Sequence, residues 1–540
     1  MRIESKRLDL HNKFIHEYEQ QNTSLLDHFD YNPYENNVFE KRISDLKEQN
    51  FDRDALANVL YKLNLKWDAD RSTFKSIESL RDQNSVVVIG GQQAGILSGP
   101  LYTINKIISI ISLAKQQEAE LGVPVLPVFW IAGEDHDYDE VNHIYLPNVS
   151  DLTKISLQDD YSERVSVSNR SLSASDATNW LRDIFGQLKE TAYTKDLVTN
   201  VEQNLHKADT FVDFFALFIH QIFKDTGLVL IDSGDKNVRE LESLHFEEMI
   251  LKQAMINEDV YKSLQSMRTK GYHVSVDVNE HDGHLFIEEN GERILLQKEQ
   301  NLWVGKNNEC QYTEAELLSV ARETPERLSN NVVTRPLMQE KLFPTLAFFA
   351  GPSEAAYWSI LKNAFHHLSM KMPPVLPRVS ITLVDQKVSK LVNKYSMLME
   401  QVLNKGVQSN KQNWLKSQSH TPVEEMADQF KALIKQGHTP MKEITTDLTN
   451  DISQFADKNL ELILAHVDQL TNRINREFTQ KYDVHLKEFD YVQMHVRPFD
   501  GLQERVWNII YFLNLYGDNW LKEINEYPFD WKKQHYIAYL

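Results

Sequence analysis

Apolar, β-branched runs that end in polar, glycine-containing loops recur along the first two thirds of the chain. Residues 86–89 are Val-Val-Val-Ile, and they lead into a loop with four glycines between Gly90 and Gly99. Pro100 then begins a stretch with apolar residues at helical spacing, and a second apolar run covers residues 125–132. Residues 84–133 are therefore predicted to form a strand, a helix and a parallel strand, and ligands bind at the carboxyl ends of such strands.

The same pattern returns further along the chain and extends the predicted sheet. A helix over residues 208–224 leads into a short apolar run at 227–232. Residues 346–350 form another apolar run, which is followed by Gly351-Pro352, a helix over 355–368 and an extended segment from Val375. Strands that alternate with helices are typical of an α/β fold with a parallel sheet.

Three other regions precede or interrupt this pattern. Residues 1–83 contain short amphipathic helices at 8–18, 39–46 and 56–63. Residues 150–200 are polar and irregular, and we interpret them as a first insertion. Residues 255–325 are predicted to form a second insertion with short strands at 271–278, 283–287 and 294–296, because Asp282-Gly283 and Asn290-Gly291 are strong hairpin-turn signals.

Helices with a regular apolar seam are predicted after residue 383. Apolar residues recur every three or four positions in three runs: Val384, Val388, Leu391, Tyr395, Leu398 and Val402; Met441, Ile444, Leu448, Ile452 and Phe455; and Ile463, Val467, Leu470, Ile474 and Phe478. This spacing favours an antiparallel coiled-coil hairpin that also joins two copies of the chain into a homodimer. The alternative is a set of helices that pack only on their own domain.

A chain of 540 residues is too long for one hydrophobic core, so we expect several parts. We predict N-terminal helices and the first half of an α/β core at 1–150, a first insertion at 151–205, core again at 206–254, a second insertion at 255–328, the second half of the core at 329–383, a helical coiled-coil domain at 384–490, and a C-terminal segment at 491–540 that packs back on the core.

Composition and charge narrow the class of function. With 58 basic and 78 acidic residues the net charge is −20, which argues against a general nucleic-acid surface but allows a small positive pocket. The single cysteine, Cys310, permits no intrachain disulfide and fits a reducing, cytoplasmic setting. No stretch approaches the ~20 apolar residues of a membrane span, so no membrane partner is expected.

The glycine-containing loop is a candidate ligand site. It matches neither a Walker A loop nor a dinucleotide-binding fingerprint. Glycine amides and a helix N-terminus favour negative charge, so Gln92, Gln93, Gly95, Ser98 and Gly99 are predicted to bind a nucleotide or a carboxylate. The alternative is a tight structural turn.

Carboxylates and histidines cluster after the second predicted strand, where Glu134, Asp135, His136 and Asp137 are consecutive. Such a cluster can supply a general base, hold Mg²⁺ or recognise an ammonium group. His136, Glu140 and His143 would make a zinc set if this stretch were helical, which we regard as the weaker hypothesis. For each acidic residue alone, the simpler interpretation is a solvated loop.

Residues 330–382 provide the remaining candidates. Asn331 and Arg335 lie in a polar segment before a predicted helix, and Ser353 and Glu354 lie in the first turn of another, where capping is the simpler role. Arg378 lies in the last extended segment, and its guanidinium could bind phosphate or carboxylate through two hydrogen bonds. The alternative for Arg378 is an ordinary salt bridge.

Five segments together resemble a known family. They are GGQQAGILSGPLYTINKI (90–107), PVFWIAGEDHDYDEVNH (127–143), NNVVTRPLMQE (330–340), GPSEAAYW (351–358) and GLQERVWN (501–508). The chain resembles the cysteine-adding enzymes of bacillithiol biosynthesis nearly end to end. The resemblance implies a ligase that joins cysteine to glucosaminyl-malate, with a Rossmann-like core similar to class I aminoacyl-tRNA synthetases, two connecting insertions and a dimerising α-helical coiled coil. The His-x-Gly-His and Lys-Met-Ser-Lys-Ser signatures of those synthetases are absent.

The resemblance and the residue patterns together suggest roles for the candidate residues. We expect ATP, with Mg²⁺ and without zinc, to activate the carboxylate of cysteine so that the glucosamine amine can attack it. The expected catalytic residues are Asp135, His136 and Asp137, the expected nucleotide-binding residues are Gln92, Gln93, Gly95, Ser98, Gly99 and Tyr102, and the expected substrate-binding residues are Glu134, Asn331, Arg335, Ser353, Glu354, Tyr357 and Arg378.

Two other classes of function compete with the ligase. One is a non-catalytic scaffold that binds a nucleotide or thiol and docks a partner through its coiled coil. The dense acidic cluster argues against it, since binding-only sites rarely concentrate such charge. The other is a metal-dependent transferase that uses His136 and His143.

Overall fold

The computed structural model describes all residues of the chain except 10–11, 149–150, 159–163, 419–421, 447, 449 and 534. The described residues form two compact units, which are considered separately. The first unit comprises Met1–Val384 and Gly501–Leu540, and the second comprises Asp385–Asp500.

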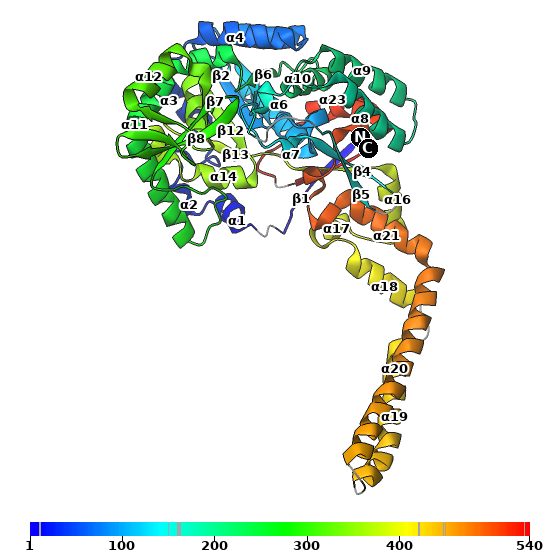
Figure 1. Ribbon diagram of the computed structural model, residues 1–540. Helices are drawn as coiled ribbons and strands as arrows, with labels where there is room; N and C mark the ends of the chain where they lie inside the picture. Colours follow the sequence, from blue (N-terminus) through cyan, green and yellow to red (C-terminus); the bar gives the residue numbers. More distant parts are fainter. Residues whose placement is uncertain are drawn as a thin grey trace. The chain divides into compact units, whose positions relative to one another are not determined.

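A five-stranded parallel sheet is the centre of the first unit (Figure 1). Its spatial order is β13 (Val375–Pro377), β12 (Thr345–Ala350), β2 (Val86–Gln92), β3 (Val125–Ile131) and β6 (Val229–Asp232). The chain runs outward from β2 through β3 to β6, and then returns to β12 on the other side of β2. This order confirms the predicted Rossmann-like α/β class, and it places the topological switch point between β2 and β12.

The strands of this sheet are apolar because both faces are covered. Every residue of β3 and β12 is buried, as are all residues of β2 except Gln92. Helix α6 (Leu101–Leu121) connects β2 to β3 and packs along both, as predicted for residues 84–133, although Pro100 caps the helix and does not begin it. The short helix η1 (Ile96–Ser98) lies in the glycine-containing loop between β2 and α6.

The N-terminal residues form helices that pack on this sheet and one unpredicted strand. The helices are α1 (Lys13–Glu19), α2 (Thr23–Leu26), α3 (Val38–Leu46), α4 (Arg53–Lys66) and α5 (Arg71–Ser79). Strand β1 (Arg2–Lys6) pairs antiparallel with β15 (His535–Tyr539), which also pairs in parallel with β14 (Ile381–Val384). The interpretation of residues 1–83 as helices alone was therefore wrong, because β1 finds its partner at the other end of the sequence.

The first predicted insertion contains more regular structure than its polar sequence suggested. It includes β5 (Leu152–Ser156), η2 (Val167–Asn169), α8 (Ala174–Gln187) and most of α9 (Thr194–Lys207), and the short helix α7 (Tyr138–Val141) and strand β4 (His143–Pro147) precede it. The prediction of an irregular segment was wrong for residues 174–207. Both helices bury a narrow apolar stripe, such as Trp180, Leu181 and Ile184 in α8, within an otherwise polar sequence.

The next segment continues the core and then forms a second sheet. Helix α10 (Phe211–Ile222) precedes β6, and α11 (Lys236–Thr269) follows it. The second sheet has the order β10 (Gln311–Thr313), β9 (Leu302–Gly305), β8 (Glu292–Glu299), β7 (Asp282–Glu289) and β11 (Leu328–Asn330), with α12 (Glu314–Glu323) and η3 (Pro325–Arg327) before β11.

This second sheet confirms one predicted turn and contradicts another. Asn290 and Gly291 both have positive φ and connect β7 to β8, as expected for this pair of residues. The strand predicted at 271–278 does not form, and Asp282-Gly283 begins β7 and is not a turn. A bulge in the pairing of β7 with β8 after Asp282 accommodates these residues within the strand.

The remaining helices of the first unit are short. They are α13 (Thr334–Leu342), α14 (Pro352–Trp358), α15 (Lys362–His367), η5 (Gln503–Arg505), α22 (Ile509–Tyr516) and α23 (Asn519–Glu526). The helix predicted at 355–368 is therefore two helices, because the chain turns at residues 359–361. None of the helices described in either unit is long and apolar enough to cross a membrane.

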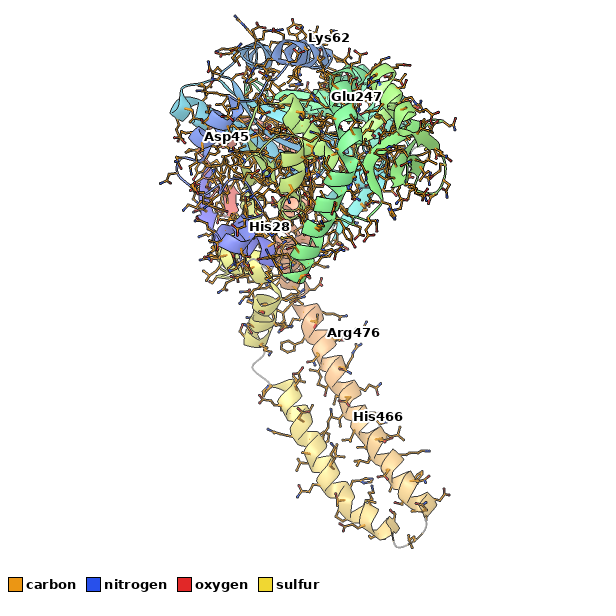
Figure 2. All side chains as sticks on the ribbon, turned by 90° about the vertical axis from the view of Figure 1, so that its left-hand side faces the viewer. His28, Asp45, Lys62, Glu247, His466 and Arg476 are labelled. Carbon is orange, nitrogen blue, oxygen red and sulfur yellow. The ribbon has the colours of Figure 1, made fainter. Side chains whose placement is uncertain are left out.

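The second unit consists of helices. They are α16 (Gln386–Lys394), α17 (Met399–Lys405), α18 (Gln408–Gln418), α19 (Val423–Thr446), α20 (Asn450–Lys481), α21 (Asp483–Val496) and η4 (Pro498–Asp500). Helices α19 and α20 form the expected antiparallel hairpin; both figures show them side by side, and Figure 2 labels His466 and Arg476 on α20. Two details were wrong: residues 384–402 span separate helices, and the run from Met441 to Phe455 crosses the hairpin turn.

Candidate functional site

A cavity of about 420 Å³ opens at the switch point, between the carboxyl ends of β2 and β12. We call it the switch-point cavity. Its lining includes nine of the predicted site residues: Gln92, Gln93, Tyr102, Asp135, Arg335, Ser353, Glu354, Tyr357 and Arg378. These residues come from six different segments of the chain. Their positions therefore agree with the expectation that ligand-facing residues gather at the carboxyl ends of the strands.

The lining of the cavity includes a carboxylate whose orientation is fixed. Asp135 follows β3, and its Oδ2 accepts a hydrogen bond of 2.9 Å from Nε2 of Gln93, which follows β2. Its Oδ1 accepts a hydrogen bond of 2.8 Å from the backbone N–H of His136. The carboxylate remains about 30% exposed and lies 3.8 Å from the Arg293 guanidinium. Asp135 is therefore oriented by its neighbours while it still faces a ligand.

Arginines also line the cavity. Arg335, at the start of α13, donates from Nη2 to the hydroxyl of Tyr357 and lies 3.6 Å from Oε1 of Glu354. No described residue accepts a hydrogen bond from its Nε or Nη1 atoms. Arg505 also lines the cavity and is exposed, and no described side chain pairs with its guanidinium. These two arginines can therefore bind an anion.

Arg378, in contrast, is already neutralised. Its two terminal nitrogens lie 2.6 and 2.7 Å from the two carboxylate oxygens of Glu504, and both side chains are buried. Arg378 therefore presents less positive charge to a ligand than its sequence position suggested. The Glu504 carboxylate also accepts a 2.7 Å hydrogen bond from Asn105. Burial alone would raise the pKa of Glu504, but Arg378 and Asn105 together lower it.

Sequence reasoning did not single out Lys106 and Arg505. Lys106 is buried on α6, although it lies between Ile104 and Ile107 in a strongly apolar segment. A lone lysine on the buried face of a predicted helix was the available signal. Arg505 lies in one of the segments that carry the family resemblance, but no residue near it in sequence pointed to the sheet.

The glycines beyond β2 have a structural role in this arrangement. Gly95, Ser98 and Gly99 do not line the cavity. Gly95 and Gly99 pack together so closely that a Cβ on Gly95 would lie 2.6 Å from Cα of Gly99. Leu97 and Ser98 have positive φ, and Nδ2 of Asn508 donates to the carbonyl oxygens of Leu97 (2.9 Å) and Gly99 (2.7 Å).

Asn508→Ala is therefore expected to destabilise the first unit by about 2–3 kcal/mol, because two buried carbonyl groups lose their donor. Urea unfolding would measure the change. Asn508→Asp keeps an oxygen that accepts from the Ile510 N–H, but it has no N–H group for the two carbonyl oxygens. It is therefore expected to be similarly unstable. An alanine variant as stable as the unmodified protein would show that the loop does not depend on these bonds.

Glu134 is part of a buried ion network and does not line the switch-point cavity. Its Oε2 contacts Nη2 of Arg239 and accepts a 3.1 Å hydrogen bond from the Asn330 N–H. Arg239 also bonds Glu242 at 2.5 Å, and burial raises the pKa of Glu242 to about 7. The network joins the loop after β3 to α11 and β11, so Glu134 fixes these elements relative to one another.

His136 and Asp137 lie beside the cavity without lining it. Nδ1 of His136 is 3.2 Å from the Arg293 guanidinium, which is itself anchored on the Asn330 carbonyl oxygen at 2.6 Å. Burial and this positive neighbour lower the pKa of His136, so the imidazole is neutral near pH 7. Burial and the charge of Asp135 raise the pKa of Asp137. Of the three predicted catalytic residues, only Asp135 faces the cavity.

The side chain of Asn331 is also occupied by hydrogen bonds within the protein. Its Oδ1 accepts hydrogen bonds from the N–H groups of Val333 (2.8 Å) and Thr334 (3.1 Å) at the start of α13. Its Nδ2 lies 3.1 Å from Nδ1 of His284, a buried residue with positive φ. Asn331 therefore positions the helix that carries Arg335. Ser353 lines the cavity in the first turn of α14.

Asp232, at the end of β6, is a buried carboxyl group that the sequence reasoning did not single out. It accepts hydrogen bonds from Ser168 Oγ (2.8 Å) and the Gly234 N–H (2.9 Å), and burial raises its pKa to about 7. Because this pKa exceeds the unfolded value, the proton favours the folded state. That stabilisation is complete below about pH 4 and is lost as the pH rises to about 7.

Asp232→Asn is expected to leave stability nearly unchanged at pH 4 and to raise it by about 2 kcal/mol at pH 8, because asparagine resembles the protonated acid at every pH. Urea unfolding at both pH values tests this. Asp277→Asn, at an exposed residue, is the control and should change stability little at either pH. Equal effects of Asp232→Asn at pH 4 and pH 8 would contradict the expectation.

The described residues contain no group of three or more His, Cys, Asp or Glu side chains placed to hold a metal ion. His143, one member of the hypothetical zinc set, instead approaches Oδ1 of Asn142 at 3.3 Å. The cavity's free N–H groups on Arg335 and Arg505 are suited to carboxylate or phosphate oxygens.

Comparison with known families identifies the chain. Residues 1–379 match the family model described as "Bacillithiol biosynthesis BshC, N-terminal Rossmann-like domain", and residues 381–540 match the corresponding C-terminal coiled-coil domain. The chain belongs to the BshC family. Both matched domains agree with the fold: the parallel sheet lies within the first range, and the helical hairpin lies within the second.

Curated members of the BshC family match almost the whole chain. A protein of Oceanobacillus iheyensis is 40% identical over 537 residues, which covers 98% of each chain. Proteins of Bacillus thuringiensis subsp. konkukian and Bacillus cereus strain G9842 are 38% and 39% identical over 512 residues, 95% of each chain. All three carry the name "Putative cysteine ligase BshC".

Proposed function

We propose that this protein is a ligase that adds cysteine to glucosaminyl-malate and so forms bacillithiol. The family membership and the name of its relatives support the reaction class. The observation that carries the proposal is that groups of both charges line the switch-point cavity: the carboxylate of Asp135 and the guanidinium groups of Arg335 and Arg505. One substrate has an ammonium and a carboxylate, and the other has an amine and two carboxylates, so the charges match both.

Arg335 and Arg505 are the proposed partners of the malate carboxylates. Arg335 is held by Tyr357 through one nitrogen, which leaves the others free to form charge-assisted hydrogen bonds with a carboxylate. Arg505 is exposed at the same cavity and can bind the second carboxylate. Arg378 fixes Glu504 and contributes to the wall more than to ligand binding.

Asp135 is the proposed partner of the reacting nitrogen or of the cysteine ammonium. Asp135 is the only carboxylate of the 134–137 cluster that lines the cavity, and Gln93 fixes its orientation. An oriented carboxylate can hold an ammonium group, and it can accept the proton that the amine loses when it attacks a carbonyl carbon.

A carboxylate is a poor electrophile, so the amide bond requires activation. We propose ATP with Mg²⁺ as the activating cosubstrate, which would supply a phosphoryl or adenylyl group to the cysteine carboxylate. Gln92 lines the cavity, and its side-chain amide can donate to the oxygens of such a group. Tyr102 lines the same wall, with the Arg378 guanidinium 5.9 Å from its ring centre.

The test is product formation by the purified protein. It is incubated with glucosaminyl-malate and cysteine, with and without ATP and Mg²⁺, and bacillithiol is measured by mass spectrometry. Product only with ATP supports an ATP-dependent ligase, and the nucleotide released separates adenylyl from phosphoryl transfer. Product without ATP would overturn the proposed activation, and no product in either mixture would count against the ligase.

We further propose that the helical hairpin joins two copies of this chain in the cytoplasm. Its helices carry apolar side chains that are more than half exposed: Met426, Phe430, Leu433, Met441, Ile444, Phe455, Leu462 and Leu470. Leu433→Glu is expected to change the molecular mass in solution from dimer to monomer, because a charge in the seam opposes association. Analytical ultracentrifugation measures this, and Lys458→Glu, at an exposed polar position of the same hairpin, is the control. A monomeric unmodified protein would contradict the proposal.

A further inference from the structure

A buried lysine, Lys106, contributes to the lining of the switch-point cavity. The side chain of Lys106 projects from α6 and is only about 1% exposed. Its Nζ lies 2.6 Å from the carbonyl oxygen of Gly91, 3.3 Å from Oε1 of Gln92 and 2.6 Å from Oε2 of Glu354. Lys106 thus connects α6 to the end of β2 and to the first turn of α14.

These three contacts indicate a charged ammonium group. A neutral amine has two N–H groups, whereas an ammonium has three, and three oxygen atoms surround Nζ. Because all three N–H groups have acceptors in the protein, Lys106 has none to offer a ligand. Its effect on binding must therefore pass through the groups that it contacts.

Glu354 is the contact that links Lys106 to ligand binding. One carboxylate oxygen accepts from Lys106 and, at 3.0 Å, from the Gly351 N–H, while the other lies 3.6 Å from Nη2 of Arg335. A single carboxylate therefore lies between two cations. The closer contact is with Lys106, and the more distant one is with the arginine that faces the cavity.

The chain leaves a specific space for the lysine. A Cβ on Gly90 would approach Cδ of Lys106 at 3.2 Å and the Phe349 carbonyl oxygen at 3.1 Å. Glycine at this position in β2 therefore lets the lysine stem pass beneath the strand end. A buried charge with matched partners and a fitted path is costly to maintain without a purpose, since an apolar residue would serve packing alone.

We propose that Lys106 is a positioning residue that neutralises Glu354 and thereby leaves Arg335 free to bind a carboxylate of a dicarboxylate ligand. This inference rests on the proposed function, because it concerns the malate end of that substrate. Without the lysine, Arg335 is the cation closest to Glu354 and pairs with it, because Arg378, which also interacts with Glu354, stays paired with Glu504. The carboxylate of Glu354 then competes with the ligand carboxylate for Arg335.

L-malate alone is the probe, and its affinity for the full-length protein is measured by isothermal titration calorimetry. Lys106→Met is expected to weaken malate binding by about tenfold or more, the effect of losing a hydrogen bond to a charged group. The double variant Lys106→Met/Glu354→Gln is expected to recover most of that loss, because it removes the competing charge as well. Lys115→Met, at an exposed position of the same helix, is the matched control.

Glu354→Gln alone keeps the test decisive if the Lys106 variant fails to fold. It is expected to bind malate at least as tightly as the unmodified protein, since Arg335 then has no competitor. Weaker binding by this variant, unchanged binding by Lys106→Met, or no rescue in a folded double variant would each overturn the inference. Absence of malate binding to the unmodified protein would overturn it too.

The same measurements separate this inference from the ligase proposal. If malate binds and the variants behave as expected while no bacillithiol forms under any condition, the inference holds and the proposed reaction fails. If bacillithiol forms but Lys106→Met binds malate normally, the reaction stands and the role of Lys106 is refuted.

Discussion

Arg335→Met is expected to lower kcat/KM for glucosaminyl-malate by at least about 100-fold while the protein remains folded. Arg335, whose side chain is 12% exposed, keeps free N–H groups in the switch-point cavity because Glu354 is already bound to Lys106. Loss of a charge-assisted contact in a site shielded from water removes about 3 kcal/mol of binding or transition-state stabilisation. Steady-state kinetics with varied glucosaminyl-malate measures the change.

The pattern of kinetic constants is as informative as its size. If Arg335 binds the malate portion equally in the ground and transition states, KM rises and kcat is preserved. Arg335→Lys keeps the charge without the planar fork and is expected to lose about tenfold. Arg268→Met, which removes an exposed guanidinium paired with Asp277, is the control for a lost arginine. An Arg335→Met enzyme with normal kinetics would remove Arg335 from the proposed site.

Arg239→Met is expected to have the largest effect on stability, a loss of about 3–5 kcal/mol. The substitution leaves the carboxylates of Glu134 and Glu242 buried without their cation. Breaking a buried ion pair by removing one partner is much more costly than removing an exposed pair. Urea unfolding, with the first unit followed by tryptophan fluorescence, measures the change.

A charge-matched variant tests the reason for that loss. Arg239→Met/Glu134→Gln/Glu242→Gln removes the stranded charges and is expected to recover a substantial part of the stability. Arg322→Met breaks an exposed pair with Glu247 and is expected to cost less than about 1 kcal/mol. If Arg239→Met lowers the free energy of unfolding no more than Arg322→Met does, the burial of Glu134 does not depend on its ion pair with Arg239.

The central sheet could be predicted because its strands carry their own signal. The runs at 86–89, 125–132, 228–231 and 346–350 are apolar throughout, as strands covered on both faces must be. Strands β1 and β15 lack such a run, since each depends on a partner from the other end of the sequence. The turn between α19 and α20 was hidden because the apolar spacing continues across it.

The candidate site was predictable to the extent that strand ends converge. Gln93 and Asp135 could be placed together because β2 and β3 are neighbours. The state of Arg378 could not be foreseen, because its partner Glu504 arrives from a distant segment. The role of Lys106 was equally hidden, since a lysine among isoleucines gives no indication of which oxygens surround it.

The small sheet formed by β1, β15 and β14 constrains how the protein can be made. Its middle strand is β15, and both neighbours precede it in the sequence. During translation β1 leaves the ribosome first and must wait, with its edge unpaired, until residues 535–539 have emerged. Assembly of this sheet therefore has to follow the emergence of β15, and a nascent chain stalled before β15 exposes two open strand edges to aggregation or to chaperones.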